Sequence, residues 1–323
     1  MTCACLAAVR EALSRVDGST EVIVVDNGSG DDSGAAIREA MPEALLLELP
    51  ENRGFPTAAS EAVRHSSGEW ILLVNNDVIF EPDAVAELLS VGESAPDIGS
   101  VAAQMRFADD EGVINSAGIG VDRLGIAFDR LLGAPVSASE DQPVEVFGAC
   151  GGAALHRRRT LDEVGGMDET FFFALEDADL AWRARMRGWR CMYAPGAVVH
   201  HRHGATTAHG SDAKYFHVGI NRIRTLAKNA DTRTLRRYGL MMIAYDLAYV
   251  TYVAAHDRTL APLRGRLRGL REWRRYRRAS APRRQVALHS PQGLRAALAR
   301  RSVWTQHSGR NGTPRAHADS VRG

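Results

Sequence analysis

The chain has few cysteines, almost no lysine and almost no net charge. Its four cysteines, Cys3, Cys5, Cys150 and Cys191, are too few for a fold built on disulfides, and none has the C-x-x-C spacing of a zinc site. A formal net charge of +1 over 323 residues excludes a protein that acts as a polyelectrolyte as a whole. We therefore expect reduced thiols and a protein that is made and retained in the cytoplasm.

Signals for export, for crossing a membrane and for binding a dinucleotide are missing as well. The N-terminus has no basic patch followed by a long apolar run, so no secretory signal is predicted. The apolar run 240–255 is shorter than the roughly 20 residues that a spanning helix needs, and Asp246 interrupts it. We therefore predict no transmembrane helix. The absence of G-x-G-x-x-G after any early strand disfavours a Rossmann dehydrogenase.

What the first hundred residues do contain is an alternation of apolar strands and helical patterns. The runs 22–25, 45–49 and 70–74 are typical of buried strands, and segments of helical periodicity separate them. This alternation predicts an α/β fold with a doubly wound, mostly parallel sheet. The length allows one large domain and an appendage.

The first of these strands ends in a polar turn. In an open α/β sheet, ligands bind beyond the carboxyl ends of the strands, so polar groups at that place are well positioned to contact a nucleotide. The same D-N-G-S sequence is also a good turn and helix N-cap, and this purely structural interpretation stays open. The residues predicted to contact a nucleotide here are Asp26, Asn27 and Ser29.

The densest group of polar and aromatic residues lies between positions 165 and 201. Glu176, Asp177 and Asp179 place negative charge on the first turn of a helix, where the helix dipole favours it, and Gly188 is a plausible end for that helix. A half-buried strand over 189–194 and a turn at 195–196 follow. For any single acid, capping of the helix is an equally good explanation.

The order of these residues resembles the C-terminal half of the catalytic domain in family 2 inverting glycosyltransferases, which have the GT-A fold, and particularly the bacterial rhamnosyltransferase-like and galactofuranosyltransferase-like branch. Those enzymes carry G-G-F-D-E-x-F-F, then E-D-x-D-L-x-x-R-x-x-x-x-G-W, then P-x-A-x-V-x-H. The apolar strand followed by Asn75, Asn76 and Asp77 similarly looks like the D-x-D motif of that family. The matching positions of the C-terminal half are Gly165, Gly166, Asp168, Glu169, Phe171, Phe172, Glu176, Asp177, Asp179, Leu180, Arg183, Gly188, Trp189, Pro195, Ala197 and His200.

The resemblance implies a role for each part of the site. Asp177 is expected to be the general base that takes a proton from the acceptor hydroxyl, with Glu176 and Asp179 as its catalytic neighbours. Asp77 and His200 are expected to hold Mg²⁺ or Mn²⁺ together with the donor diphosphate. Further contacts to the nucleotide-sugar are expected from Asn52, Gly54, Asn75 and Asn76.

The resemblance covers about residues 5 to 230 and departs from the family in three places. The family begins with a strand that this sequence does not show before its first helix, which predicts either a start codon placed too far downstream or a real loss of that strand. The segment from Gly54 to Ser60 lacks the usual asparagines, and Asn75 replaces the first aspartate of the metal motif. These departures affect donor binding more than acid–base chemistry.

We divide the chain into a glycosyltransferase domain (1–214), a basic helical extension (215–307) and a disordered tail (308–323). In the extension, Tyr245, Tyr249 and Tyr252 share one helical face ahead of a series of arginines, which fits a helix in the interface of an anionic membrane. A solvated basic helix packed on the main domain is the alternative. No nucleic-acid recognition module accompanies these arginines. They are Arg264, Arg266, Arg268, Arg271, Arg274, Arg275, Arg277 and Arg278.

The sequence thus predicts an inverting, metal-dependent glycosyltransferase on the cytoplasmic face of the cell membrane. Its expected partners are a nucleotide-sugar donor, of rhamnose or a related sugar, and a cell-envelope glycan or polyprenyl-linked acceptor. The alternative function is that of a catalytically degenerate, glycosyltransferase-like binding protein at the membrane.

Overall fold

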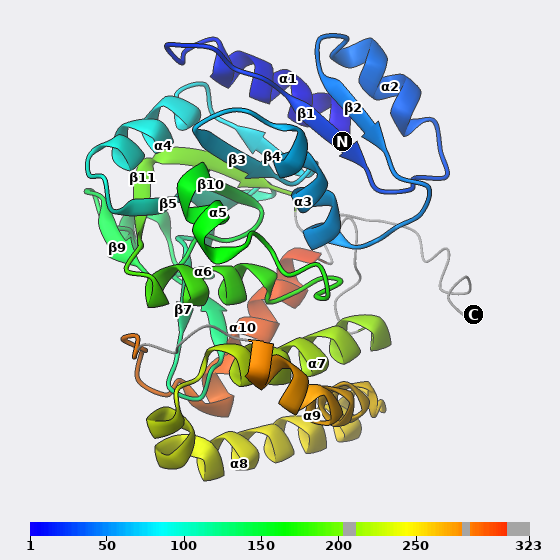
Figure 1. Ribbon diagram of the computed structural model, residues 1–323, viewed down its shortest axis with the longest axis vertical. Coiled ribbons are helices and arrows are strands. Elements are labelled where there is room, and N and C mark those ends of the chain that lie inside the picture. The colour runs from blue at the N-terminus through cyan, green and yellow to red at the C-terminus, as the bar shows by residue number, and fades with distance from the viewer. Residues whose placement is uncertain (203–210, 280–284, 309–323) are drawn as a thin grey trace.

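The computed structural model describes residues 1–202, 211–279 and 285–308. The expected alternation of strands and helices forms the N-terminal part of the fold, at the top of Figure 1. Its elements are α1 (Thr2–Leu13), β1 (Ile23–Asp26), α2 (Ser33–Ala40), β2 (Leu45–Glu48), α3 (Phe55–His65), β3 (Trp70–Val74), β4 (Val78–Phe80) and α4 (Ala84–Glu93).

The main sheet has seven strands and is mixed. Its order is β3-β10-β5-β11-β4, with β6 on β5 and β9 on β11. Only β5 and β11 pair in parallel there, so the expected mostly parallel arrangement is replaced by a mixed one. The further strands are β5 (Ile98–Phe107), β6 (Asp110–Ser116), β9 (Val144–Val146), β10 (Ala153–Arg157) and β11 (Arg190–His201), and β7 (Ile119–Val121) pairs with β8 (Ala127–Asp129) in a small sheet.

Strands β1 and β2 form a parallel pair of their own, in register from Ile23 opposite Leu45 to Asp26 opposite Glu48. Within the described residues, no strand pairs with the outer edge of β1 or with the outer edge of β3. The first α/β units of the fold are therefore joined to the main sheet by helices instead of by a continuous hydrogen-bonded ladder. Helix α1 packs against both α2 and β4.

Side chains that alternate along β3 build a layer on each face of the main sheet. Trp70, Leu72 and Val74 pack on one side with α1 and α4, while Ile71 and Leu73 pack on the other with residues of α3, α5 (Arg158–Val164) and α6 (Glu176–Met186). Since successive strand residues point to opposite faces, one short apolar run supplies both layers. The result is a sheet between two helical layers, as Figure 1 shows.

Strand β11 differs from its prediction at one point. The turn expected at Pro195-Gly196 is wrong, because the chain stays beside β5 on both sides of it, with a register shift between Ala194 and Val198. Proline lacks the N–H that a ladder needs, and a bulge accommodates it without reversing the strand. The bulge lets β11 reach from Arg190 to His201 as a single strand.

Within the described residues, the predicted C-terminal extension consists of four helices, of which the first three lie at the bottom of Figure 1 and the last reaches toward its middle. They are α7 (Asp212–Asn229), α8 (Thr232–His256), α9 (Ala261–Ala279) and α10 (Gly293–Ser308). Helices α7 and α9 pack closely because Gly265 and Gly269 face α7, where a Cβ on Gly265 would lie 2.2 Å from the carbonyl oxygen of Phe216. The expected disordered tail lies outside the described residues, apart from Ser308.

Helix α8 turns its tyrosines toward the protein, so the face that we expected to meet a membrane is partly buried. The Tyr245 and Tyr249 rings stack on each other, and the guanidinium groups of Arg222 and Arg266 lie over them. Burial raises the pKa of both tyrosines. Arg266, one of the arginines counted as surface charge, is itself buried.

Helix α8 is also the one helix of the described residues that is long and apolar enough to cross a membrane by length and composition. Its best window has a mean hydropathy of 1.2, and 11% of that window is buried. Asp246 lies in the middle of the helix and is held against the protein by Arg222 and Arg266. The prediction that the segment does not span a membrane remains a prediction.

The ion pairs of Asp246 give a test of how α8 is attached. Asp246 Oδ1 accepts from Arg222 Nε at 2.7 Å and from Arg266 Nε at 2.9 Å, and all three side chains are 15% exposed or less. Asp246→Ala leaves two buried guanidinium groups without their carboxylate, which typically costs about 3–5 kcal/mol. We expect a loss of that order in denaturant unfolding. Glu43→Ala, at the exposed Arg10–Glu43 pair, should change stability by less than about 1 kcal/mol, and equal effects would contradict the assignment.

Candidate active site

A strained turn introduces helix α6. Ala174 and Leu175 both have positive φ, at 70° and 68°, although neither is glycine. Asn221 of α7 stabilises this turn by donating from Nδ2 to the carbonyl oxygens of Phe173, at 3.0 Å, and Ala174, at 2.9 Å. Non-glycine residues with such backbone angles persist only where their surroundings hold them, and they occur often at functional sites.

The turn leads directly to the first two acids of α6. Asp177 is half-buried, and its Oδ2 accepts a hydrogen bond from the Gly151 N–H at 3.2 Å while Oδ1 accepts from the Ala178 N–H at 2.7 Å. Glu176 is buried, and its Oε2 has no hydrogen-bond partner in the described part of the chain. The Asp177 carboxylate is thus oriented through both of its oxygens, whereas one oxygen of the Glu176 carboxyl is left without a partner.

This difference separates the two acids electrostatically. Burial and the adjacent charge of Asp177 raise the pKa of Glu176. Burial also raises the pKa of Asp177, but the N–H groups of Gly151 and Ala178 stabilise its anion and limit the rise. Two close carboxyl groups with different surroundings titrate apart. Of the two carboxyl groups, Glu176 is therefore the one that burial and its neighbour favour as the protonated acid, and Asp177 is the one whose anion the backbone stabilises.

Asp179, the third acid of this turn, makes buried ion pairs that join two helices. Its side chain is fully buried and pairs with Arg183 Nε, Lys228 Nζ and Asn229 Nδ2, each at 2.8 Å. Burial alone would raise its pKa, but Arg183 and Lys228 lower it. Lys228 also reaches Asp168, at 2.7 Å. Asp179 therefore ties α6 to α7 and positions the helix, while its place among the catalytic neighbours stays a prediction.

The predicted metal pair is corrected in one of its two members. Asp77 is buried, and the imidazole that faces it belongs to His201, with Nε2 3.4 Å from Asp77 Oδ1. His200 points to the other face of β11, where its Nε2 lies 3.1 Å from Glu81 Oε1. Adjacent strand residues point to opposite faces, so only one of two neighbouring histidines can reach Asp77.

Asp77 and His201 fit a divalent cation as a partial ligand set. Asp77 Oδ1 is buried and makes no hydrogen bond to another described residue, so it is a candidate metal ligand. His201 Nδ1 lies 3.0 Å from Asn115 Oδ1, a contact that orients the ring with Nε2 toward Asp77. No cluster of three or more ligating residues occurs among the residues described, so other ligands would have to come from elsewhere.

The loops after β1 and β2 meet, as the donor-site prediction requires. Asn27 Oδ1 accepts from the Arg53 N–H at 2.9 Å, and Asn27 Nδ2 donates to Asn52 Oδ1 at 3.1 Å. Gly54 has φ of +83°, and a Cβ there would lie 2.2 Å from the carbonyl oxygen of Phe172. The loop that contains Gly54 is thereby packed against the segment that leads into α6.

Asp26 makes a local contact, and the asparagines after β3 contact distant parts of the chain. Asp26 Oδ1 accepts from the Ser29 N–H at 2.9 Å, so the turn interpretation of D-N-G-S holds locally. Asn76 Nδ2 donates to Thr2 Oγ1 at 3.1 Å, which directs that side chain to α1. The Asn75 N–H donates to the Gly152 oxygen at 3.0 Å. Since Gly151 bonds Asp177, the glycine pair 151–152 links the Asp77 loop to the acids of α6.

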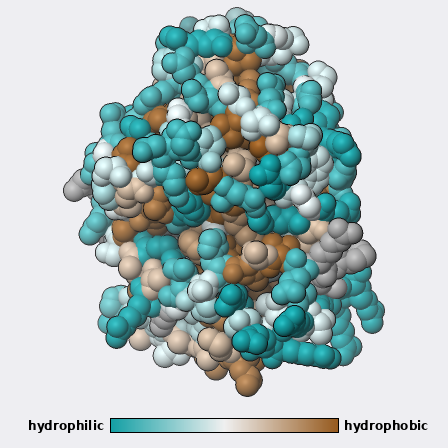
Figure 2. Space-filling model, turned by 90° about the vertical axis from the view of Figure 1, so that its left-hand side faces the viewer, coloured by the Kyte–Doolittle hydropathy of each residue, from teal (hydrophilic) through white to brown (hydrophobic). Residues whose placement is uncertain are grey.

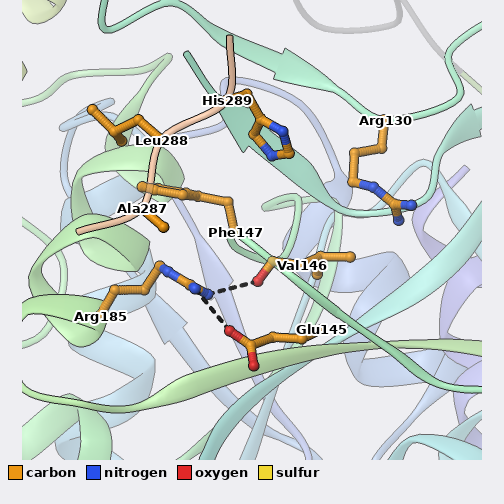
Figure 3. Close-up of a pocket in the computed structure, with 8 residues that line it drawn as sticks. All are labelled: Arg130, Glu145, Val146, Phe147, Arg185, Ala287, Leu288 and His289. Carbon is orange, nitrogen blue, oxygen red and sulfur yellow. Dashed lines mark hydrogen bonds and ion pairs between the residues drawn. The ribbon is translucent and has the colours of Figure 1, made fainter. Parts of the chain in front are cut away.

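Figure 3 shows a cavity of about 210 Å³ beside the C-terminal half of α6, which we call the Arg185 pocket. It is lined by Arg130, Glu145, Phe147, Arg185 and segment 287–289 among others, and by none of the three acids of the α6 first turn. Arg185 donates to the Val146 oxygen and to Glu145 Oε1, so its charge is already compensated. The pocket is separate from the acids at the start of α6.

Sequence reasoning missed two groups of residues. His201 could have been found by counting, because the seven-residue pattern P-x-A-x-V-x-H that starts at Pro195 ends at His201. Lys228 and Asn229 gave no such signal, since they stand at the end of an amphipathic helix about 50 residues after Asp179. Only the packing of α7 on α6 reveals them.

Comparisons with known proteins agree with this fold. The model of the family "Glycosyl transferase family 2" matches residues 3–165. The N-acetylglucosaminyl-diphospho-decaprenol L-rhamnosyltransferase of Mycobacterium tuberculosis is 29% identical over 208 residues, which cover 57% of this chain and 67% of that protein. The O-antigen biosynthesis protein RfbC of Myxococcus xanthus is 29% identical over 201 residues, 58% of this chain but 15% of its own length.

Among solved structures, the chain resembles GalNAc-T7, crystallised with UDP, GalNAc and Mn²⁺. The TM-score is 0.53 at 13% sequence identity, and the match covers 68% of this chain and 43% of that one. A likeness at this identity concerns the fold, which is the GT-A glycosyltransferase fold with added C-terminal helices. The chain belongs to glycosyl transferase family 2, and it is a glycosyltransferase.

Proposed function

We propose that the protein is an inverting glycosyltransferase in which Asp177 is the general base. The observation that carries this proposal is the pair at the start of α6, where the Asp177 carboxylate accepts from two backbone N–H groups beside Glu176, whose pKa burial raises further. A base needs an ionised, oriented carboxylate close to its substrate, and the strained turn at Ala174 and Leu175 fixes its position. Asp177 would take the acceptor hydroxyl proton as that oxygen attacks the anomeric carbon.

We further propose that Asp77 and His201 bind Mg²⁺ or Mn²⁺ together with the diphosphate of a nucleotide-sugar. The buried oxygen of Asp77, which has no hydrogen-bond partner among the described residues, and the facing imidazole support this assignment. A cation bound there would neutralise charge that develops on the leaving diphosphate. The loops with Asp26, Asn27, Asn52 and Gly54 would contact the nucleotide.

For the substrates, we propose transfer of rhamnose or a related sugar to a cell-envelope glycan or a polyprenyl-linked acceptor on the cytoplasmic side of the membrane. The mycobacterial relative supports this choice, because its name specifies rhamnose and a diphospho-decaprenol acceptor. The identity of 29% leaves both sugar and acceptor as proposals. Peripheral attachment to the membrane would bring the site to a lipid-linked acceptor.

The test is transfer by the purified full chain from a panel of nucleotide-sugars to isolated lipid-linked and soluble glycan acceptors. We expect acceptor-dependent release of nucleoside diphosphate with a rhamnose-type donor, and NMR of the product should show an anomeric configuration opposite to that of the donor. Retention of configuration would overturn the assignment of Asp177 as a simple base. A failure to transfer any sugar would favour the catalytically degenerate alternative.

A further inference from the structure

A second cavity, of about 350 Å³, lies between the start of α8 and the segment before α10. We call it the Arg237 pocket; its lining includes Arg123, Arg233, Arg237, Tyr238 and residues 285–288. All three arginines are exposed, and Arg237 Nε donates to the Tyr238 hydroxyl at 3.2 Å. Hydrogen bonding to Arg237 and the nearby charge of Arg123 lower the Tyr238 pKa, so these groups converge.

The charge of this pocket is uncompensated. Across residues 1–202, 211–279 and 285–308, no carboxylate lies within 4.0 Å of a guanidinium nitrogen of Arg123, Arg233 or Arg237. The neighbouring Arg185 pocket, which shares Ala287 and Leu288 with it, differs in this respect because Glu145 pairs with Arg185. Guanidinium groups without acidic partners favour an anionic ligand, and they match phosphate oxygens well in geometry.

The wall of the Arg237 pocket is built into the fold. The His289 N–H donates to the Val121 oxygen at 2.9 Å, and the Arg123 N–H donates to the His289 oxygen at 3.0 Å. Asp122 is fully buried and accepts from the backbone N–H groups of Leu124, Ile126 and Gln292. These bonds fix the segment after residue 285 beside the loop that carries Arg123.

The solvent-facing side of α8 continues from this pocket as an apolar strip. Arg233, Arg237, Leu240, Ala244 and Leu247 recur at spacings of four, three, four and three residues, which places them on one helical face. The large exposed side chains near the strip are Leu240 at 85%, Met241 at 49%, Ile243 at 59% and Leu247 at 61% exposed. Figure 2 shows apolar atoms at the lower end of the molecule, where α8 lies in Figure 1.

An outward helix face of this kind is unusual for a protein surrounded by water. The exposed positions from 240 to 248 carry no charge, whereas the outward face of α9 carries arginines. Contiguous apolar surface beside basic groups is typical of helices that lie in the interface of an anionic bilayer. The order along α8, with arginines at its start and apolar residues after them, complements a phosphate headgroup and the acyl chains beneath it.

We propose that the Arg237 pocket binds the phosphate headgroup of an anionic phospholipid, while the exposed strip of α8 lies in the bilayer interface. This inference rests on the proposed peripheral location and assigns it to a surface different from the one that the sequence predicted. The tyrosine face of α8 is internal, and the arginine series of α9 is not required. The bilayer contact is thus one basic pocket and one apolar helix face.

The experiment is co-sedimentation of the full chain with phosphatidylcholine vesicles that either contain or lack phosphatidylglycerol, at low and high salt. We expect binding only to the anionic vesicles and weakening by salt, because exposed charges are screened. Arg233→Gln/Arg237→Gln should weaken binding at least about 10-fold. Leu240→Ser/Ile243→Ser should weaken it comparably. The matched control is Arg271→Gln/Arg274→Gln, two exposed arginines of α9, which should stay within about twofold of the parent chain.

Circular dichroism and thermal unfolding of each variant show whether it is folded. The proposal is overturned if the α9 control loses binding as much as the pocket variant, or if inorganic pyrophosphate occupies the pocket while anionic vesicles do not bind. It is also overturned if the α8 variant changes only the oligomeric state, which would mean that a second copy covers the strip. Vesicle binding needs no sugar donor, so the Asp177→Asn variant should bind vesicles normally. A failure of the enzymatic proposal is therefore distinguishable from a failure of the membrane proposal.

Discussion

Asp177→Asn is expected to lower the rate of sugar transfer by about 100- to 10,000-fold, the usual effect of removing a general base. The amide keeps the size of the side chain and can still accept from the Gly151 and Ala178 N–H groups, so the fold should survive. What it cannot do is take the acceptor proton. The measurement is steady-state transfer, with thermal unfolding as a check of the fold. Near-normal turnover would remove Asp177 from the mechanism.

Glu176→Gln is the matched control for this prediction. Because the raised pKa of Glu176 keeps it protonated at neutral pH, the neutral amide resembles its native state. Activity should therefore stay within about 10-fold of the parent enzyme, well above that of Asp177→Asn. The base must be ionised, so activity should fall as pH drops through the raised pKa of Asp177, at a pH above the ordinary aspartate value of about 3.9. A larger loss in Glu176→Gln than in Asp177→Asn would reverse the two roles.

Removal of divalent cations is expected to abolish transfer, and Mn²⁺ or Mg²⁺ should restore it. The residues that decide this are Asp77 and His201, which face each other at 3.4 Å. Asp77→Ala and His201→Gln should each raise the metal concentration for half-maximal activity by at least about 10-fold. Titration calorimetry of Mn²⁺ in the presence of nucleoside diphosphate measures the same affinity without turnover.

His200→Gln is the internal control for the metal site. His200 lies beside Glu81 on the opposite face of β11, so its replacement should leave the metal requirement within about twofold of the parent enzyme. An effect of His200→Gln equal to that of His201→Gln would argue against the geometry of the site. Full activity in the presence of chelator would remove the metal from the mechanism altogether.

Sequence patterns were sufficient wherever local chemistry decides the structure. The apolar runs at 22–25, 45–49 and 70–74 became strands because their residues can be buried on both faces of a sheet. The acids at the start of α6 and Gly188 just past its end mark the helix correctly, since Gly188 has φ of +92° and follows the last turn. The GT-A fold and the family follow from the order of these elements and motifs.

The sheet and the histidine assignment depended on more than composition. Strand direction is set by which strands come to lie beside each other, and β5 brings the antiparallel β10 and the parallel β11 together across about 90 residues of chain. The choice between His200 and His201 depends on the face that β11 presents to Asp77, and the bulge at 195–197 shifts its register. Local sequence patterns carry no information about which strands lie beside β5 or which face of β11 meets Asp77.

By itself, the sequence determined the family, the elements and the place of Asp177, because strand runs, helix starts and motif spacing are properties of consecutive residues. Tertiary structure alone decided which groups meet. Asp179 became a buried anchor because α7 delivers Lys228 and Asn229 to it, and the tyrosines of α8 turned inward because Arg222 and Arg266 lie beneath them. Burial and ion pairing join residues far apart in the chain, so their energies are fixed only when the helices pack.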